Sequence, residues 1–523
     1  MRDFSFPGRS TVITSNGMCA TSHPLAAKIA VQLLEQGGNA VDAAIAAAMV
    51  LNVAEPQMTG LGGDCFVLLK PAGSEEIIGL NGSGRAPAAL EAARIRADGH
   101  TVMPVDGVDS ITLPGAVDAM VRLSTDHGRL GLKTSLAPAI HYAEQGIPVA
   151  ARTAFDWEIA KDRLKGPARD RYLFDGRPPV EGQVFRAPQQ AEVLRRIALE
   201  GRAGFYEGEV AEDMADTLKA LGGCHTLDDF ANVTCDYVDP VSTDYRGTEL
   251  VELPPNGQGA TALLLANILS EFDLSPLDPF GVERAHIEAE ATKLAYDARN
   301  RFVADPAARL DHMLSKDTAK RLAALIDMER AMDSPAALSE SVHKETVYLT
   351  VVDRDRMAVS LIYSIFHSFG SGMASEKFGI LFQNRGAGFT LEQGHPNEAA
   401  GGKRPMHTII PGMLKRNGKV IMPFGVMGGQ YQSTGHVRFL GNMVDFGMTP
   451  QQAIDGPRCF VDGGELSMES GYSEEIRAGL AALGHKVSLR KVPWGGAQAI
   501  LLAENGTLHG ASDPRKDGCA IGY

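Results

Sequence analysis

The residue pattern changes abruptly near position 345, and this change limits the folds open to the chain. Before it, Lys-Arg-Leu-Ala-Ala-Leu-Ile at 320–326 is typical of a helix end, and the polar, small-residue stretch that follows predicts an exposed loop. After it, Thr-Val-Tyr-Leu-Thr-Val-Val-Asp at 346–353 is β-branched and aromatic, as strands are. A similar run at 357–364 follows a short turn, so we expect the two runs to pair as a hairpin.

This change divides the chain into a helix-rich segment, 1–345, and a strand-rich segment, 346–523. In the first segment one helix is expected from Ser22-His-Pro onward, and Asn39 is expected to cap a second. The second helix is nearly all small or apolar, which predicts burial on most sides. Further helices are expected between about 115 and 330, including 191–199 and 210–221. Further strands are expected at 379–382, 408–410 and 419–422.

Composition excludes several classes of protein. A chain of 523 residues corresponds to about three domains or to one large fused unit. The net charge of −14, without a basic cluster, argues against nucleic acid or an anionic membrane as partner. The six cysteines contain no CxxC pair, which favours a reducing compartment. The longest apolar stretch, about 15 residues, is shorter than the roughly 20 that span a bilayer, and the first residues lack the apolar run of a secretory signal. We expect a cytoplasmic protein.

The motifs that hold metals and nucleotides are missing from the sequence. The fourteen histidines form no HExxH or HxxxH pattern, so no metal site is expected. No Walker sequence, no strand-linked GxGxxG and no GxSxG elbow occurs, so no nucleotide cofactor and no serine-hydrolase elbow are expected.

Thr346 offers a different chemistry. If the chain is cut just before it, the new α-amine, with an ordinary pKa near 8, can act as general base for its own hydroxyl. By itself, a threonine that opens a strand is better explained as a structural residue.

A series of sequence blocks resembles the γ-glutamyltranspeptidase family of N-terminal-nucleophile hydrolases. The blocks keep the family order over almost the whole chain, so many matches in one register argue against chance. They include Gly-Met-Cys-Ala-Thr-Ser-His-Pro-Leu-Ala at 17–26, Gly-Gly-Asn-Ala-Val-Asp-Ala-Ala-Ile-Ala at 37–46, Glu-Pro-Gln-Met-Thr-Gly-Leu-Gly-Gly-Asp at 55–64, Leu-Pro-Gly-Ala-Val at 113–117, the run 346–353, Phe-Gly-Ser-Gly at 369–372, Gly-Gly at 428–429 and Gly-Pro-Arg at 456–458.

The resemblance implies a four-layer αββα fold that is made as a single precursor. Self-cleavage between Glu345 and Thr346 would give chains of 345 and 178 residues that stay associated as one fused unit. Thr346 would be the nucleophile, first in an N-to-O acyl shift and then toward the substrate amide. Ser364 falls where the family has a second hydroxyl beside the nucleophile.

The resemblance also implies how the substrate is held. Gly428 and Gly429 match the family's glycine pair, whose backbone N–H groups hold the oxyanion, and glycine lets the backbone approach the substrate closely. Arg85, in Asn-Gly-Ser-Gly-Arg-Ala-Pro at 81–87, falls on the arginine that clamps the substrate carboxylate.

The sequence departs from the family where an α-ammonium group would be held. Arg385 replaces a glutamine, Ala387 and Gly388 stand where paired acids are expected, and Phe366 replaces an asparagine. Arg404-Pro405 replaces a serine pair. This pattern resembles the branch that contains cephalosporin acylase-like proteins and oxamate amidohydrolase.

The predicted site has therefore lost carboxylates and gained positive charge, which suits an anionic amide without an ammonium group. The candidates for substrate contact are Arg85, Arg385, Arg404 and His407. His407 and His436 are also explained as structural histidines.

We therefore expect an autoprocessed threonine amidohydrolase acting on a small-molecule amide, with hydrolysis favoured over transfer and without cofactor, nucleic acid or membrane as partner. Authentic γ-glutamyltransferase or glutathione hydrolase activity is the alternative within the class. A non-catalytic, uncut binding protein on the same fold is the alternative outside it.

Overall fold

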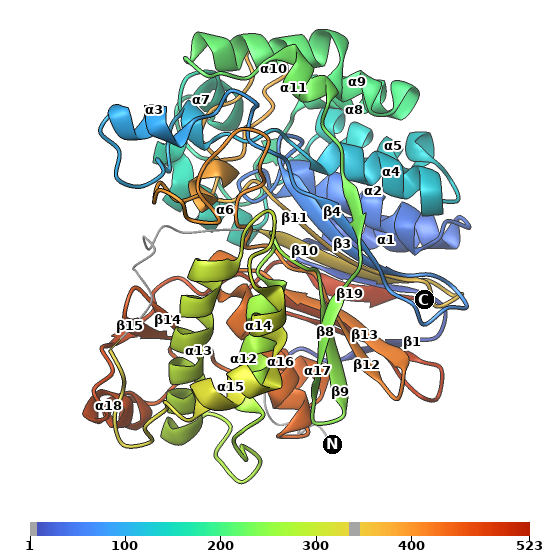
Figure 1. The fold of residues 1–523 in the computed structure, drawn as a ribbon. Helices are drawn as coiled ribbons and strands as arrows, with labels where there is room; N and C mark the ends of the chain where they lie inside the picture. Colours follow the sequence, from blue (N-terminus) through green and yellow to red (C-terminus); the bar gives the residue numbers. More distant parts are fainter. Residues whose placement is uncertain (1–7, 334–345) are drawn as a thin grey trace.

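The structure, a computed structural model, describes residues 8–333 and 346–523. Two seven-stranded antiparallel sheets lie face to face, and helices cover the outer face of each sheet (Figure 1). The fold is thus the four-layer αββα arrangement expected from the sequence. Among the described residues, none of the helices combines the length and the apolar character that a membrane span needs.

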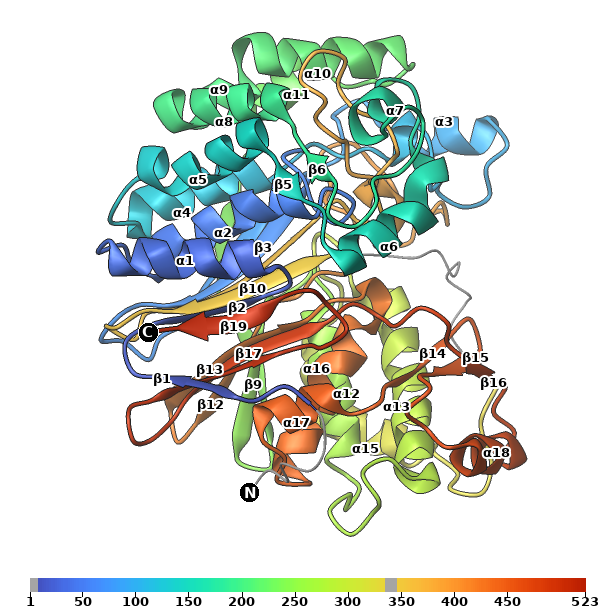
Figure 2. The ribbon, with the colours of Figure 1, turned by 180° about the vertical axis from the view of Figure 1, so that it is seen from behind.

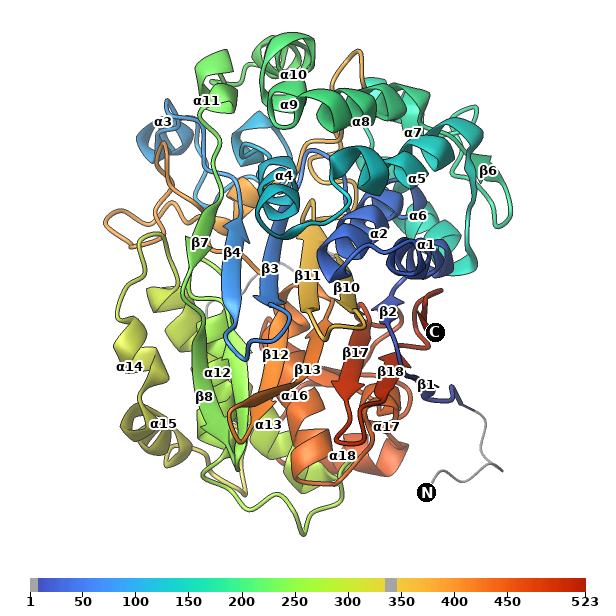
Figure 3. The ribbon, with the colours of Figure 1, turned by 90° about the vertical axis from the view of Figure 1, so that its right-hand side faces the viewer.

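The first sheet contains the predicted hairpin at its centre and has the order β19-β2-β10-β11-β3-β4-β7. Its strands are β19 (Cys519–Gly522), β2 (Met18–Thr21), β10 (Val347–Val352), β11 (Ala358–Ser364), β3 (Asp64–Lys70), β4 (Ile78–Gly82) and β7 (Asp236–Val238). Strands from before and after residue 345 are therefore neighbours in one sheet (Figure 3).

The second sheet also combines strands from before and after residue 345, and it has the order β1-β18-β17-β13-β12-β9-β8. Its strands are β1 (Val12–Thr14), β18 (Leu508–Ser512), β17 (Ala497–Leu502), β13 (Lys419–Val426), β12 (Gly412–Arg416), β9 (Thr248–Glu252) and β8 (Val241–Tyr245). Two small sheets lie outside this pair, one of β14 (Cys459–Asp462), β15 (Glu465–Met468) and β16 (Val487–Leu489), the other of β5 (Ile147–Pro148) and β6 (Val184–Phe185).

Strand β10 directs its side chains alternately to two different cores, because successive residues of a strand point to opposite faces. Val347, Leu349 and Val351 pack against the outer helices. Tyr348 and Val352 pack against the second sheet. Tyr348 fits there because residue 425 on β13 is glycine: a Cβ at this position would lie 2.3 Å from the tyrosine ring. By the same alternation, Thr346 faces the space between the sheets.

The outer layer on the first sheet is built around two helices that the sequence predicts, α1 (Pro24–Glu35) and α2 (Ala40–Ala54) (Figure 2). The Asn39 side chain accepts from the first turn of α2 while Asp42 accepts from the Asn39 N–H, which forms a capping box. Every residue of α2 is buried, as its composition predicts. His23 caps α1, within the Ser22-His-Pro start that the sequence predicts. The other helices on this side are α3 (Ala92–Ala97), α4 (Ala116–His127), α5 (Leu132–Gln145), α6 (Ala151–Ala160), α7 (Pro167–Tyr172), α8 (Pro188–Glu200), α9 (Ala203–Tyr206), α10 (Gly208–Ala220) and α11 (Leu227–Ala231).

The outer layer on the second sheet has α12, α13 and α16 at its centre (Figure 1). Its helices are α12 (Gly259–Leu269), α13 (Val282–Phe302), α14 (Leu310–Leu314), α15 (Lys316–Ala323), α16 (Gln432–Val444) and α17 (Pro450–Asp455). Helix α18 (Glu474–Ala482) packs beside the small sheet that contains β14.

Three expectations about local structure need correction. Strands β7 to β9 lie in a region that was expected to be mainly helical. The sequence pattern misses them because they are only three to five residues long and two of them follow closely on helical sequence. Residues 408–410 form no strand, and 379–382 contribute only isolated bridges, such as Gly62 to Phe382. The loop expected before Thr346 lies outside the described residues.

Candidate active site

Three strand ends place the predicted nucleophile beside Ser364, and Ser364 beside Asp64. Thr346 precedes β10, Ser364 ends β11, and Asp64 opens β3. Val347 pairs with Tyr363, and Ser364 pairs with Asp64 in the sheet register. The hydroxyl oxygens of Thr346 and Ser364 lie 3.4 Å apart, which is long for a hydrogen bond between hydroxyls. All three side chains are buried.

Ser364 links this row of residues to Arg385. One terminal nitrogen of Arg385, Nη2, donates to the Ser364 oxygen at 2.9 Å, and Nη1 donates to the Thr408 hydroxyl, also at 2.9 Å. The backbone N–H of Phe366 donates to the same Ser364 oxygen. The Arg385 guanidinium lies 4.1 Å from the centre of the Phe366 ring, within the range of a cation–π contact.

Arg385 is a buried cation that lacks a carboxylate partner. Its side chain is fully buried, and no ion pair joins it to a carboxylate in residues 8–333 or 346–523. Its Nε has no hydrogen-bond partner in the described part of the chain. Burial lowers the pKa of Arg385 to about 9, while the more distant Asp64 raises it, so the guanidinium is charged at neutral pH. An isolated buried charge is costly, and a bound anion would relieve that cost.

Asp64 and His407 form a buried pair behind Arg385. The His407 Nε2 lies 3.1 Å from the Asp64 carboxylate, and its Nδ1 accepts from the Ile409 N–H. Burial, with the nearby Arg385, lowers the pKa of His407 to about 3, so this ring is neutral at physiological pH. Both ring nitrogens therefore have protein partners. A direct contact between His407 and substrate stays a prediction that would require one of these bonds to break.

The predicted oxyanion pair lies where β13 ends and a short 3-10 helix (Gly429–Tyr431) begins. Gly428 has φ +122° and Gly429 has φ +57°, a backbone that disfavours other residues. The Gly428 carbonyl accepts from the Tyr431 N–H at 3.1 Å. In the described part of the chain, no atom accepts a hydrogen bond from the N–H of Gly428 or of Gly429. Two N–H donors are thus unused within the described residues, and their role in holding an oxyanion stays a prediction.

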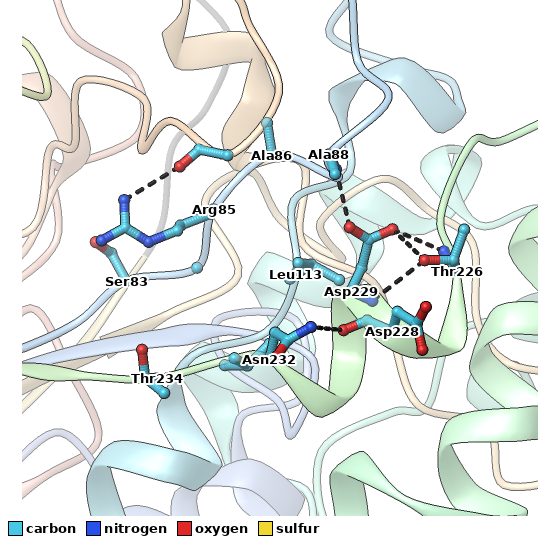
Figure 4. A pocket seen from close by; sticks show the side chains of 13 residues that line it. Ser83, Arg85, Ala86, Ala88, Leu113, Thr226, Asp228, Asp229, Asn232 and Thr234 are labelled. Atoms are coloured by element: carbon cyan, nitrogen blue, oxygen red, sulfur yellow. Dashed lines mark hydrogen bonds between the residues drawn. The ribbon is translucent and has the colours of Figure 1, made fainter.

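Arg85 lies in a different environment, beside a cavity of about 380 Å³ (Figure 4). Its guanidinium lies 3.2 Å from Asp305 and 3.5 Å from Asp236, and it donates to the Gly402 carbonyl. The side chain is 41% exposed. None of its contacts within the described residues is to Thr346, Ser364 or Arg385.

Arg404 is held by the backbone. It donates to the carbonyls of Ser83 at 2.9 Å and Thr234 at 3.1 Å, and it pairs with Asp236 at 2.6 Å. These contacts use the guanidinium to join three segments of the protein. Contact of Arg404 with substrate stays a prediction.

One of the two positions where paired acids were expected, Gly388, has little room for an acid. Arg385–Gly388 form a short 3-10 helix. A Cβ on Gly388 would lie 2.4 Å from the Met406 carbonyl, so an aspartate there would require a backbone shift. The described structure therefore offers no carboxylate at 387 or 388 for an ammonium group.

The comparisons with known proteins show the family of this chain. A model of the family described as Gamma-glutamyltranspeptidase matches residues 26–523. The chain belongs to the gamma-glutamyltranspeptidase family.

Its relatives in the family match it from end to end. The "Glutathione hydrolase-like YwrD proenzyme" of Bacillus subtilis is 37% identical over 98% of this chain and 99% of its own length. The "Oxamate amidohydrolase proenzyme" of Klebsiella pneumoniae is 34% identical over 98% of this chain and 100% of its own. The crystal structure of cephalosporin acylase from Bacillus halodurans has a TM-score of 0.93 and 38% identity, and the match covers 100% of this chain and 99% of that one. The chain is thus an enzyme of the hydrolase and acyltransferase kind that this family contains.

Asp64 and Thr408 are site residues that sequence reasoning left without a role. Asp64 ends the family block Gly-Leu-Gly-Gly-Asp, and an acid at the start of an apolar strand-like run is a sequence signal that could have marked it. Besides His407, the Asp64 carboxylate accepts from the backbone N–H groups of Gly84 and Gly115 and from the Gln383 side chain. Nothing in the sequence near Thr408 indicates that its hydroxyl binds Arg385.

Proposed function

We propose that this enzyme is an autoprocessed amidohydrolase that uses Thr346 to hydrolyse the amide of a small substrate carrying a carboxylate. The relatives named as proenzymes support the processing step. In that step the Thr346 hydroxyl attacks the carbonyl of Glu345, and an ester replaces the peptide bond. Water then cleaves the ester and leaves Thr346 with a free α-amine. Glu345 itself lies outside the described residues.

The proposed catalytic cycle repeats this chemistry on the substrate. The α-amine of Thr346 takes the proton of its hydroxyl, and the hydroxyl oxygen attacks the substrate amide. The N–H groups of Gly428 and Gly429 stabilise the oxyanion, and ammonia or an amine leaves with a proton. Water then hydrolyses the acyl ester. The Ser364 hydroxyl is the side-chain group beside the nucleophile, and a small approach from the present 3.4 Å would let it hold the Thr346 oxygen by a hydrogen bond.

The observation that carries the choice of substrate is the unpaired, buried Arg385. Its guanidinium donates a hydrogen bond to Ser364, and Ser364 lies beside Thr346. A substrate carboxylate on Arg385 would place a nearby amide within reach of the nucleophile. A planar guanidinium binds a carboxylate by a two-pronged contact, which also fixes its orientation. Arg85 is the second candidate for this task, although two aspartates already flank it.

An α-ammonium group is disfavoured in the same place. Such a group would lose its hydration on entering a site in which Arg385 is positive and residues 387 and 388 supply no carboxylate. Losing a buried charge contact costs about 2–5 kcal/mol, a factor of about 30 to several thousand at 1.4 kcal/mol per tenfold. We therefore favour amides such as oxamate or glutaryl amides over γ-glutamyl compounds. The relative named glutathione hydrolase-like supports the alternative activity.

Substrate kinetics on the cleaved protein test this choice. We expect kcat/KM for hydrolysis of carboxylate-bearing primary amides, measured by released ammonia, to exceed kcat/KM for hydrolysis of glutathione or γ-glutamyl-p-nitroanilide, measured by released cysteinylglycine or p-nitroaniline, by at least tenfold. If the γ-glutamyl compounds are better by tenfold or more, another residue binds the ammonium, and γ-glutamyltransferase or glutathione hydrolase activity replaces this proposal.

The nucleophile is tested separately by Thr346→Ala. The wild-type protein should run as two chains, and the shorter chain should begin Thr-Val-Tyr-Leu on amino-terminal sequencing. The variant should remain one chain of 523 residues without amidase activity. Cleavage of the variant at the same bond would refute the assignment of Thr346. A wild-type protein that stays uncut and inactive would favour a binding protein.

A further inference from the structure

Arg299 is a second buried arginine without an acidic partner, and it lies on helix α13. Its side chain is nearly fully buried, and the part of the chain that the structure describes contains no carboxylate in an ion pair with it. Its guanidinium lies 4.3 Å from the centre of the Tyr296 ring. Burial lowers its pKa from the ordinary arginine value. The protein therefore bears the cost of a second buried charge, at a side chain whose hydrogen-bond partners in the described part of the chain do not include Thr346.

The partners of Arg299 are side-chain amides. Nε and Nη2 donate to Asn300, and Nη1 donates to the amide oxygens of Gln258, at 3.1 Å, and of Gln430. A guanidinium has donors only. It therefore fixes which end of each glutamine amide faces it, and Gln258 must present its oxygen to Arg299 and its Nε2 to the opposite side.

That opposite side of Gln258 is the loop that carries the glycine pair. Gln258 Nε2 donates to the Gly429 carbonyl at 3.0 Å and to the Thr408 carbonyl at 2.7 Å. The Gln430 carbonyl accepts from the Tyr296 hydroxyl on α13. The peptide groups that follow Gly429 and Gln430 are thus held from outside the loop, while the N–H groups of Gly428 and Gly429 have no acceptor among the described residues.

We propose that Arg299 is a positioning residue that sets the geometry of the oxyanion donors through Gln258 and Gln430. The inference rests on the proposed function, because it assumes that Gly428 and Gly429 hold an oxyanion. Donors that are fixed before the reaction stabilise the transition state without reorganisation. Arg299 and Gln258 precede the proposed cut and the loop follows it, so one chain positions the catalytic backbone of the other.

Two variants test the proposal on the cleaved enzyme. Arg299→Lys keeps the charge but loses the fork that reaches both glutamines. Gln258→Glu keeps the size and gives Arg299 an ion pair, yet it removes the donor to the Gly429 carbonyl. Removing a direct oxyanion donor lowers kcat by about 100- to 1,000-fold. For these indirect changes we expect kcat to fall by about 10- to 100-fold, with KM within about threefold of wild type.

Arg284→Lys is the matched control. Arg284 is buried on the same helix, but it pairs with Glu288 and donates to the Pro279 carbonyl, away from the glycine loop. We expect this control to lower the melting temperature as much as Arg299→Lys does while kcat stays within about twofold.

The outcomes separate this inference from the function on which it rests. If the wild-type enzyme hydrolyses carboxylate amides but the kcat values of Arg299→Lys and Gln258→Glu match the control, Arg299 is structural only. The same conclusion follows if kcat and KM change together, or if Arg299→Lys folds but never matures. If the cleaved wild-type enzyme hydrolyses no amide, the proposed function fails first and the inference with it.

Discussion

Arg385 and Arg85 are both candidates for holding the substrate carboxylate, and the structure gives them opposite surroundings. Arg385 is fully buried, next to Ser364, and unpaired with any described carboxylate. Arg85 is 41% exposed and lies between Asp236 and Asp305. Both carry one positive charge, but only Arg385 has a charge that the described protein leaves uncompensated. The difference teaches that an arginine's availability to a ligand depends on its partners more than on its place in a motif.

Truncation of each arginine gives the largest expected difference. Arg385→Met should lower kcat/KM for carboxylate amides by about 30-fold to several thousand-fold, because a buried charge contact of about 2–5 kcal/mol is lost. Arg85→Met should lower it by less than about threefold, since exposed pairs contribute little. Kinetics on the cleaved variants measure both. A larger loss for Arg85→Met would reverse the assignment and restore the role predicted from its motif.

An acid introduced beside Arg385 should compensate its charge, as Asp236 and Asp305 do for Arg85. Ala387→Asp places a carboxylate on the same 3-10 helix without the backbone clash expected at Gly388. We expect kcat/KM for carboxylate amides to fall about 10- to 100-fold. The ratio of kcat/KM for carboxylate amides to kcat/KM for γ-glutamyl compounds should therefore decrease. Ala387→Asn, which has the same shape without the charge, is the control. Equal losses in the two variants would show that bulk, not charge, is responsible.

A smaller effect is expected on the free energy of unfolding at acid pH, because Arg385 helps to lower the pKa of His407. The pKa of His407 is about 3 in the folded protein, against about 6.5 when unfolded. The stability due to its neutral ring is therefore fully present above pH 6.5 and is lost as the pH falls toward 3, by about 2 kcal/mol at pH 5. Arg385→Met removes one cause of this low pKa, so it should lose less stability than wild type between pH 7 and pH 5. Urea unfolding measures the difference, and an unchanged pH slope would argue against the coupling.

The smallest effect is expected when Arg85 loses one of its aspartates. Asp305→Asn should change the free energy of unfolding by less than about 1 kcal/mol, because the pair is partly exposed. Activity should change by less than about twofold. A fivefold rise in affinity for anionic amides would show instead that Arg85 reaches the substrate once it is released from Asp305.

The sequence predicts those parts of the fold that depend on local pattern. The hairpin of β10 and β11 follows from two β-branched runs, and α2 follows from its cap and its apolar composition. The adjacency of Thr346, Ser364 and Asp64 depends instead on the register of three strands, two of which are far apart in the chain. Arg299 gave no sequence signal, because its partners are ordinary amides that come together only in the folded protein.

The interleaving of strands in both sheets has a consequence for the enzyme after the proposed cut. β10, which would begin the shorter chain, pairs with β2 of the longer chain on one side, and β11 pairs with β3. The two chains could not separate without opening both sheets and the core between them. Dissociation would then be the same event as denaturation, so the thermal midpoint of the mature enzyme should rise with protein concentration, whereas that of the uncut precursor should not.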